Sequence, residues 1–363
     1  MTNTRVNEID LLRFFAALSV VFFHYSFRGY AADAMSVMPY PLLAPFSKYG
    51  YLGVELFFII SGFVILMTAA SGSLRRFFVS RVVRLYPAFW ACCTITFAAI
   101  IAIGGSRFSA SISQYLINLT MLNGFVGVPS IDGVYGTLLV EMKFYALVAV
   151  ILAIGRIHQA QLFLILWLIA SIALEIMPIS SLRSLLIVEF SAYFIAGATY
   201  FLIWSQGVSL TRVGMIILSW GLAVFQTVNR LSTFEKHYNT VMSSDVVAGI
   251  ITVFFFVMLL VSLKRTGFFS RNNWLLAGSL TYPLYLLHQN IGFMIFNIAY
   301  PAINPHLLLW STIAAALGAA YAVHVFIEKK FSLPLKNAIN NSINFMQRLV
   351  NTAIQEVSSI KTR

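Results

Sequence analysis

The sequence predicts an all-α protein, a bundle of about ten membrane-spanning helices with both termini in the cytoplasm. Of its 363 residues, 60% are hydrophobic and only 10% are charged, whereas soluble domains carry roughly 25% charged residues. Apolar runs of about 20 residues recur along the chain, and each can cross the ~30 Å hydrocarbon layer as a helix. Lys and Arg are also unevenly divided between the intervening loops. These observations exclude a soluble globular protein.

Polar residues, Gly and Pro punctuate the apolar runs and define the expected elements in order. A less hydrophobic stretch at 105–134, rich in Gly, Ser and Asn, is predicted to be a loop whose segment 112–122 dips into the bilayer surface. We divide the chain into a membrane domain, 1–335, and a cytoplasmic tail, 336–363, which is predicted to be a basic amphipathic surface helix. The ten predicted spans are 9–27, 50–70, 85–104, 135–154, 160–178, 183–204, 210–228, 245–263, 275–299 and 307–327.

Loop charges set the predicted orientation. Sixteen Lys and Arg residues fall on the side that holds the termini and six on the other side, and basic residues accumulate in the cytoplasm. This asymmetry accounts for much of the net charge of +12 without a nucleic-acid partner. Glu8, Asp10 and Arg13 interrupt the start of the first span, so we expect no cleaved signal peptide. The predicted location is a bacterial inner membrane.

The first span carries two ionisable residues on one face. Arg13 and His24 are 11 residues apart, which is 20° past three full turns, with an offset of about 16 Å along the helix. Arg presents a fixed fork of donors suited to phosphate, and neutral His can accept a proton from a hydroxyl. The pair therefore suggests an anchor for an anionic donor and a general base. A snorkelling Arg and a core His are the alternative.

The other intramembrane charges follow in chain order. Glu55 lies near the outer end of the second span, where hydration alone would explain it. Glu141 lies about 9 Å deep in the fourth span, at the depth of His24, and could orient its imidazole. A protonated Glu141 bonded to another polar residue is equally consistent. Lys143 points elsewhere, because residues two apart on a helix do not share a face.

Two further segments carry candidate groups. Arg81 and Arg84, three residues apart in a basic loop before the third span, would share one face of a helix. They could bind an anionic soluble cofactor or, as the alternative, lipid headgroups. His288 lies beside Tyr285 in a span that Pro283 loosens, and a substrate contact and a structural His are both open.

Several chemistries lack support in the sequence. There is no Walker-type glycine loop, GxSxG elbow, HExxH or dinucleotide fingerprint. The only cysteines are the adjacent Cys92 and Cys93, which provide neither a disulfide framework nor a Cys-rich metal site. We expect no metal cofactor.

Six stretches in order resemble the integral-membrane acyltransferase-3 family, whose members transfer acyl groups, commonly acetyl, to sugars and other surface molecules. They lie at residues 7–24, 50–63 and 81–87, with weaker matches at 137–145, 282–289 and 326–331. The resemblance implies that His24 is the catalytic base. It also implies that Arg13 matches the family's Arg of the first helix, that Arg81 and Arg84 contact an acyl-CoA donor, and that Glu141 matches the family's acidic position in the fourth span. We expect Arg13 to contact the donor phosphates as well.

The sequence and the resemblance together predict an O-acyltransferase. It would move an acyl group, acetyl by preference, from cytoplasmic acyl-CoA to a hydroxyl of a glycan or glycolipid, such as a polysaccharide or lipopolysaccharide of the cell envelope. His24 would be the base with Glu141 as its partner, and Glu55, Tyr285 and His288 would contact substrate. An ion-coupled transporter that uses the same intramembrane groups is the alternative, and a non-catalytic membrane scaffold is a third possibility.

Overall fold

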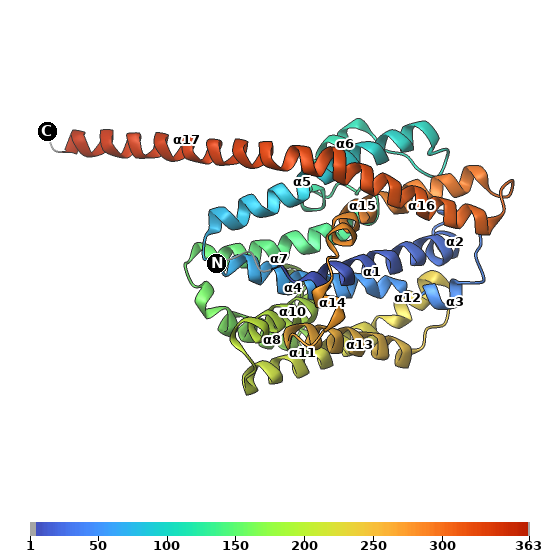
Figure 1. The fold of residues 1–363 in the computed structure, drawn as a ribbon, viewed down its shortest axis with the longest axis horizontal. Coiled ribbons are helices and arrows are strands. Elements are labelled where there is room, and N and C mark those ends of the chain that lie inside the picture. The colour runs from blue at the N-terminus through green and yellow to red at the C-terminus, as the bar shows by residue number, and fades with distance from the viewer. Residues whose placement is uncertain (1–4, 362–363) are drawn as a thin grey trace.

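The computed structural model describes residues 5–361, with side chains through residue 352. This part of the chain is helical and contains no strand (Figure 1), which confirms the predicted all-α bundle. Nine of its helices are long and apolar enough to cross a membrane. We call the end of the bundle where α1 begins the proximal face and the end where α1 finishes the distal face.

The first half of the chain supplies the helices α1, α4, α5 and α7 of the bundle. The helix α1 continues without interruption through a π-helical turn, η1, into α2, and a 3₁₀ turn, η2, leads directly into α4. The elements are α1 (Asn7–Phe23), η1 (His24–Arg28), α2 (Gly29–Ala31), α3 (Ala44–Ser47), η2 (Gly50–Leu52), α4 (Gly53–Ala69), α5 (Leu74–Ile103), α6 (Ile112–Asn118), η3 (Asn123–Val126) and α7 (Tyr135–Ala153).

The second half completes the bundle. A short helix, α9, precedes α10, so the sixth predicted span begins later than its predicted limit at 183. The elements are η4 (Ile157–Gln159), α8 (Ala160–Ile176), α9 (Ser180–Leu185), α10 (Val188–Gln206), α11 (Leu210–Asn229), α12 (Leu231–Tyr238), α13 (Ser244–Ser262), α14 (Phe268–Arg271), α15 (Leu275–Ala299), α16 (Pro305–Val323), η5 (His324–Glu328) and α17 (Lys329–Lys361).

The third predicted span begins too late. The segment that contains Arg81 and Arg84, predicted to be a loop, belongs to α5, which starts at Leu74. The hydroxyl of Ser73 accepts a hydrogen bond from the backbone N–H of Arg76 at 3.2 Å and caps the helix. Basic residues do not interrupt a helix, although they do end an apolar run, so hydropathy placed the boundary at the wrong residue.

The ninth predicted span, 275–299, is the helix α15, but it is not among the nine apolar helices. It packs against α1, α5 and α16, which surround it with apolar surface. A polar helix is tolerated at membrane depth when its polar groups face protein rather than lipid. Its buried polar residues are Ser279, Thr281, His288, Gln289 and Asn290.

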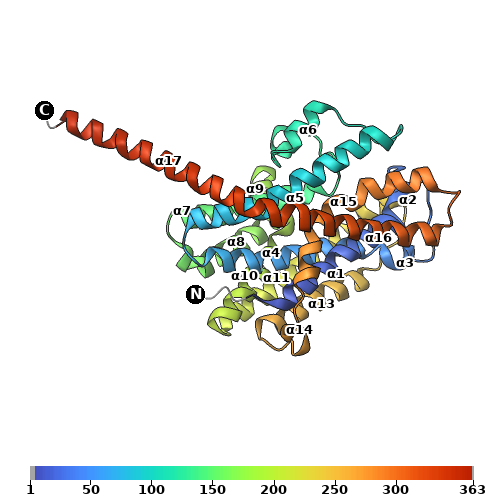
Figure 2. The same cartoon turned by 45° about the horizontal axis from the view of Figure 1, so that its top comes forward.

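The last spanning helix continues into the tail. Helical structure runs without a break from Pro305 to Lys361, across the predicted domain boundary at 335/336. Figures 1 and 2 both show α17 extending beyond the rest of the bundle at the end where the chain begins. The first turns of α17 pack along α5, so the predicted tail shares a surface with the membrane domain.

The closest helix crossing joins α4 and α10. A Cβ atom on Gly197 would collide with the carbonyl oxygen of Ile59, and one on Gly62 with that of Phe194. Small residues allow this approach, as is common between membrane helices. We expect Gly197→Ala to lower the melting temperature in detergent, because backbone atoms cannot yield as side chains do. Gly214→Ala, which meets no atom within 4 Å, is the control and should melt as the wild type does.

Candidate active site

Two histidines meet at the centre of the candidate site. His24 opens the π-helical turn η1 and is 7% exposed, whereas His288 lies in the middle of α15 and is fully buried. His288 Nε2 lies 3.0 Å from His24 Nδ1. The two residues, 264 positions apart in sequence, come together because α15 packs along α1.

Hydrogen bonds fix the tautomers of both rings. His288 Nδ1 lies 2.9 Å from the carbonyl oxygen of Tyr285 and 3.2 Å from that of Leu284. A carbonyl oxygen can only accept, so this nitrogen carries the proton and the opposite Nε2 of the neutral ring accepts. His24 Nδ1 faces that acceptor and the carbonyl oxygen of Val20, at 2.9 Å, so it also carries a proton.

The consequence is a free lone pair on His24. With Nδ1 protonated, Nε2 of the neutral imidazole is the basic nitrogen. It makes no hydrogen bond to any of the residues that the structure describes. His24 can therefore accept a proton on one side while His288 holds the other side of the ring. This is the arrangement that a general base requires.

The backbone around His288 is held by groups from two other elements. The hydroxyl of Tyr25 donates to the carbonyl oxygen of His288 at 2.7 Å. The carboxylate of Asp132, in the loop before α7, accepts the backbone N–H of Asn290 at 3.0 Å and that of Val134 at 3.2 Å. Asp132 is fully buried. Sequence reasoning missed both residues, because neither the helical turn that holds Tyr25 nor the loop that holds Asp132 shows in its sequence which helix it will contact.

Burial raises the pKa of Asp132 to about 6, although hydrogen bonds from the backbone N–H groups of Asn290 and Val134 and the charge of Arg28 act in the opposite direction. The unfolded chain releases this proton near pH 4. Asp132 therefore contributes less to the free energy of unfolding as the pH rises from about 4 through about 6.

Asp132→Asn cannot ionise, which provides a test. The melting temperature of the wild type minus that of the variant should decrease as the pH rises from about 4.5 to about 7.5. Thermal unfolding of both proteins in the same detergent, followed by tryptophan fluorescence, measures this difference. A difference that does not change with pH would contradict the raised pKa.

A cavity of about 290 Å³ lies beside the histidine pair, and Arg13 lines it on the side toward the proximal face. Its walls come from α1, α4, α5, α7 and α15. Five of the predicted site residues line it together: Arg13, Arg81, Arg84, Glu141 and Tyr285. His24 and His288 are not among its lining residues. The ring of Tyr285 lies 5.7 Å from that of His288, so Tyr285 separates the cavity from the pair.

The structure places Glu141 in this cavity and does not bring it to His24. Its carboxylate accepts hydrogen bonds from the hydroxyl of Ser61 at 2.6 Å and from that of Tyr145 at 2.5 Å. His24 is bonded to His288 in its place. Glu141 faces α4 and the cavity, within electrostatic reach of Arg13, while His24 lies 11 residues further along α1 and faces α15. The predicted shared depth of Glu141 and His24 is therefore wrong. Tyr145 lies four residues after Glu141, a spacing that could have indicated this pair.

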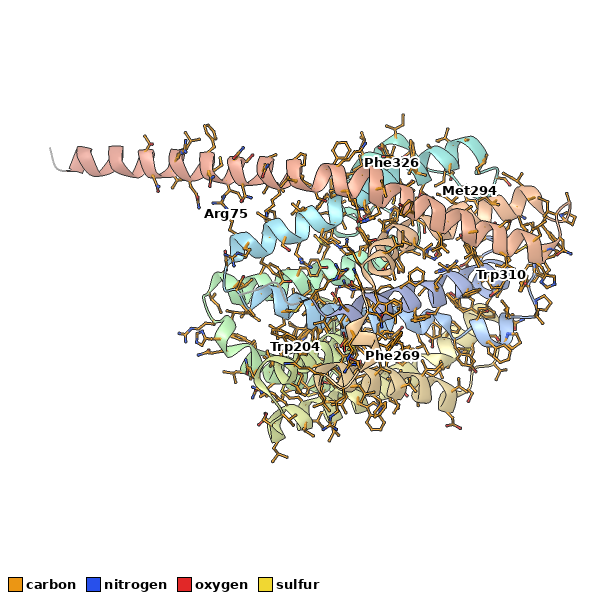
Figure 3. All side chains as sticks on the ribbon, in the orientation of Figure 1. Arg75, Trp204, Phe269, Met294, Trp310 and Phe326 are labelled. Atoms are coloured by element: carbon orange, nitrogen blue, oxygen red, sulfur yellow. The ribbon has the colours of Figure 1, made fainter. Side chains whose placement is uncertain are left out.

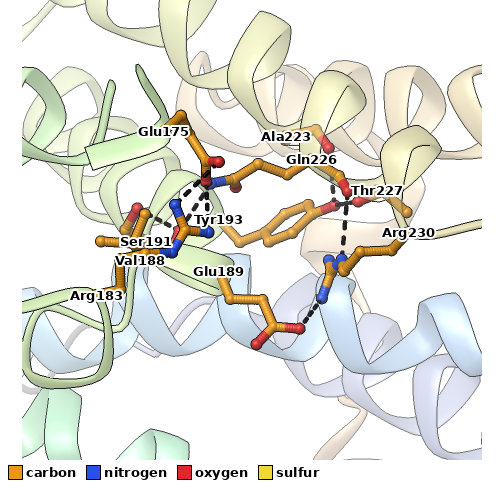
Figure 4. Close-up of polar contacts among 10 residues, drawn as sticks. All are labelled: Glu175, Arg183, Val188, Glu189, Ser191, Tyr193, Ala223, Gln226, Thr227 and Arg230. Carbon is orange, nitrogen blue, oxygen red and sulfur yellow. Dashed lines mark hydrogen bonds and ion pairs between the residues drawn. The ribbon is translucent and has the colours of Figure 1, made fainter. Parts of the chain in front are cut away.

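Glu55 belongs to a different polar cluster. It is buried in the first turn of α4, outside the cavity, within electrostatic reach of Arg230 and Glu189. Figure 4 shows the contacts next to Glu55, which is not drawn there: Arg230 pairs with Glu189, and the amide of Gln226 bonds to Glu175. These contacts join α8, α10 and α11. The cluster connects these helices, and none of its contacts places Glu55 next to His24 or His288.

The described residues contain no group of three or more His, Cys, Asp or Glu side chains placed to hold a metal ion. The candidate site therefore consists of a histidine pair, a cavity with three arginines, and Tyr285 between them. It can bind a phosphate-bearing molecule at its proximal end and accept a proton at the other end.

Comparisons with known proteins identify the family. The chain matches the acyltransferase-3 family model, described as an acyltransferase domain, over residues 6–327. It is 31% identical over 173 residues to Nodulation protein 10 of Rhizobium leguminosarum bv. viciae, a match that covers 41% of this chain and 45% of that protein. The match thus spans a little under half the length of that relative. No solved structure matches. The chain, an integral membrane protein, therefore belongs to the acyltransferase-3 family of acyltransferases.

Proposed function

We propose that this protein is an O-acyltransferase that takes an acetyl group from acetyl-CoA on the cytoplasmic side and transfers it to a hydroxyl of an envelope glycan or glycolipid. The observation that carries the proposal is the arginine-lined cavity, which ends at Tyr285 beside the paired histidines. Arg13, Arg81 and Arg84 supply fixed positive charge for phosphate, which Arg binds in a bidentate manner.

The donor enters from the proximal face in this proposal. A cavity of about 290 Å³ is near the lower limit for a small-molecule site, so it suits an acylated pantetheine arm better than a complete nucleotide coenzyme. The carboxylate of Glu141 accepts hydrogen bonds from the hydroxyls of Ser61 and Tyr145, and its negative charge partly offsets the positive charge of the three arginines. We therefore assign Glu141 to the donor cavity. His288, rather than Glu141, is the partner of His24 in this proposal.

The chemistry follows from the lone pair of His24. His24 Nε2 takes the proton of the acceptor hydroxyl as the oxygen attacks the thioester carbonyl carbon. The carbon–sulfur bond then breaks, and the CoA thiolate takes the proton from the imidazolium. The acceptor leaves as an ester, and His24 returns to its neutral form. His288 Nε2 accepts the Nδ1–H of His24 throughout, which stabilises the imidazolium while it is present.

The proposal places the proximal face in the cytoplasm of a bacterial inner membrane, with both termini inside. The bias of Lys and Arg supports this orientation. Arg13 then lies on the side of the donor cavity toward the compartment that contains acyl-CoA, and the first helix carries His24 toward the outer face. Fusion of a periplasm-specific reporter enzyme to the C-terminus tests this orientation, and an active reporter would contradict it.

The test of function uses the purified protein in liposomes. With acetyl-CoA labelled on the acetyl group and extracted envelope glycans as acceptors, we expect release of free CoA and label in the glycan fraction. Acetyl phosphate and longer acyl-CoA molecules provide the donor comparison. Absence of both signals from every acyl-CoA, with the protein correctly inserted, would overturn the proposal.

A further inference from the structure

A second depression, outside the cavity, lies on the proximal face between α5 and α17. Its volume is about 690 Å³, and its charged lining residues are Arg75, Arg76, Arg84 and Lys336. None of its lining residues is acidic, although Arg84 also faces Glu328 at 3.5 Å. The groove therefore combines enough space for a nucleotide with a concentration of positive charge.

The groove leads into the arginine-lined cavity. Ser80 and Arg84 line both spaces, and Arg76, Ser80 and Arg84 follow at intervals of four along α5. Residues at this spacing form one ridge of a helix. A molecule that extends along this ridge would therefore contact both spaces through the same residues of α5.

The tail helix forms the opposite wall of the groove. Arg75 donates to the side-chain oxygen of Asn340 at 2.9 Å and to its carbonyl oxygen at 3.1 Å, which holds α17 against α5. Figure 3 shows Arg75 beneath α17. Arg75 is thus occupied by the tail. By contrast, Arg76 and Lys336 are exposed and make no ion pair with any of the described residues.

The first turn of α5 adds to the positive potential. Ser73, which caps the helix, lines the groove. The N-terminus of a helix carries partial positive charge and unpaired backbone N–H groups that favour phosphate. Arg76, Lys336 and this helix end therefore converge on one open space.

We infer that this groove binds the adenosine end of the donor, and that Arg76 and Lys336 contact its 3′-phosphate and the adenosine-side phosphate of the diphosphate, whose other phosphate meets the arginines of the cavity. The inference rests on the proposed function and extends it, because it makes the tail helix part of the donor site. The phosphate chemistry also fits the headgroup of an anionic lipid, so the experiment must separate the two sources.

The test compares donors that differ at the nucleotide end. We expect the double variant Arg76→Ala, Lys336→Ala to raise KM for acetyl-CoA about tenfold, with kcat unchanged, since both side chains are remote from the reacting atoms. The KM for acetyl-pantetheine, which lacks the nucleotide, should not change. Arg348→Ala, on the same helix but outside the groove, is the control and should keep the KM values of the wild type.

A binding measurement makes the inference independent of turnover. The wild type should bind adenosine 3′,5′-bisphosphate in phosphatidylcholine nanodiscs, and the double variant should bind it about tenfold more weakly. Wild-type binding without any acyl transfer would keep the nucleotide site and overturn the proposed function. Acyl transfer with an unchanged KM for acetyl-CoA in the double variant would support the proposed function and overturn the nucleotide site.

Two other results would also overturn the nucleotide site. One is an equal rise in KM for acetyl-CoA and acetyl-pantetheine, which would show that the substitutions disturb the cavity. The other is a rise in KM that occurs only in liposomes containing phosphatidylglycerol and disappears in pure phosphatidylcholine. That result would assign the groove to an anionic lipid.

Discussion

Replacement of His24 by alanine should lower kcat for acetyl transfer by about 10²–10⁴-fold. The substitution removes Nε2, the nitrogen of His24 that the hydrogen bonds of its ring leave free to accept a proton. Binding of acetyl-CoA should be preserved, because the arginines that line the cavity are untouched. Release of CoA and label transfer, measured over a range of donor concentrations, separate the effect on kcat from that on KM.

His158→Ala is the matched control, because His158 is exposed in the loop between α7 and α8. It should have wild-type kcat. Both variants should elute from size-exclusion chromatography as the wild type does, which shows that they fold. A folded His24→Ala protein that retains wild-type kcat would exclude His24 as the base.

Replacement of His288 should cause the second-largest decrease in kcat. His288→Phe removes the acceptor that holds the Nδ1 proton of His24, and the ring is then free to place that proton on either nitrogen. Loss of the group that sets the tautomer of a catalytic histidine costs up to about 10⁴ in kcat in the serine-protease triad. Here the carbonyl oxygen of Val20 still faces Nδ1 at 2.9 Å, so we expect a loss of about 10²-fold.

His288→Gln provides the conservative comparison, because a glutamine side-chain oxygen can accept the same N–H. It should restore a substantial part of the activity that His288→Phe loses. The ¹⁵N NMR spectrum of histidine-labelled protein reports the tautomer directly. His24 should be protonated at Nδ1 in the wild type, and both of its tautomers should be populated in His288→Phe. An unchanged His24 tautomer together with lost activity would contradict the positioning role.

The sequence predicted the spans well and the contacts between them poorly. Bilayer thickness fixes the length of an apolar run, and the predicted span 275–299 has the same bounds as α15. The predicted shared depth of Glu141 and His24 is wrong, because Glu141 bonds to Ser61 and lies within electrostatic reach of Arg13, which is 11 residues before His24. The rotation of one helix relative to another depends on how all the side chains pack, and the sequence of two helices does not contain it. For this reason His288, rather than Glu141, faces His24.

More of the donor side than of the histidine pair could be predicted from the sequence. The pairing of Arg81 with Arg84 on one helix face follows from their spacing, and both line the cavity with Arg13. The contribution of α17 could not be anticipated, because a hydropathy boundary at 335 separated it from the residues it contacts. Asn340 lies 265 positions from Arg75, and only the fold brings them together.

The polarity of α15 has a consequence for biogenesis. The nine apolar helices can partition into the bilayer as they leave the translocon, whereas α15 carries His288, Gln289 and Asn290 and gains much less from lipid. Its insertion depends on α1 and α5, which are synthesised earlier, and on α16, which follows it at once. The histidine pair therefore forms only when translation is nearly complete, and a chain truncated before α15 lacks the pair.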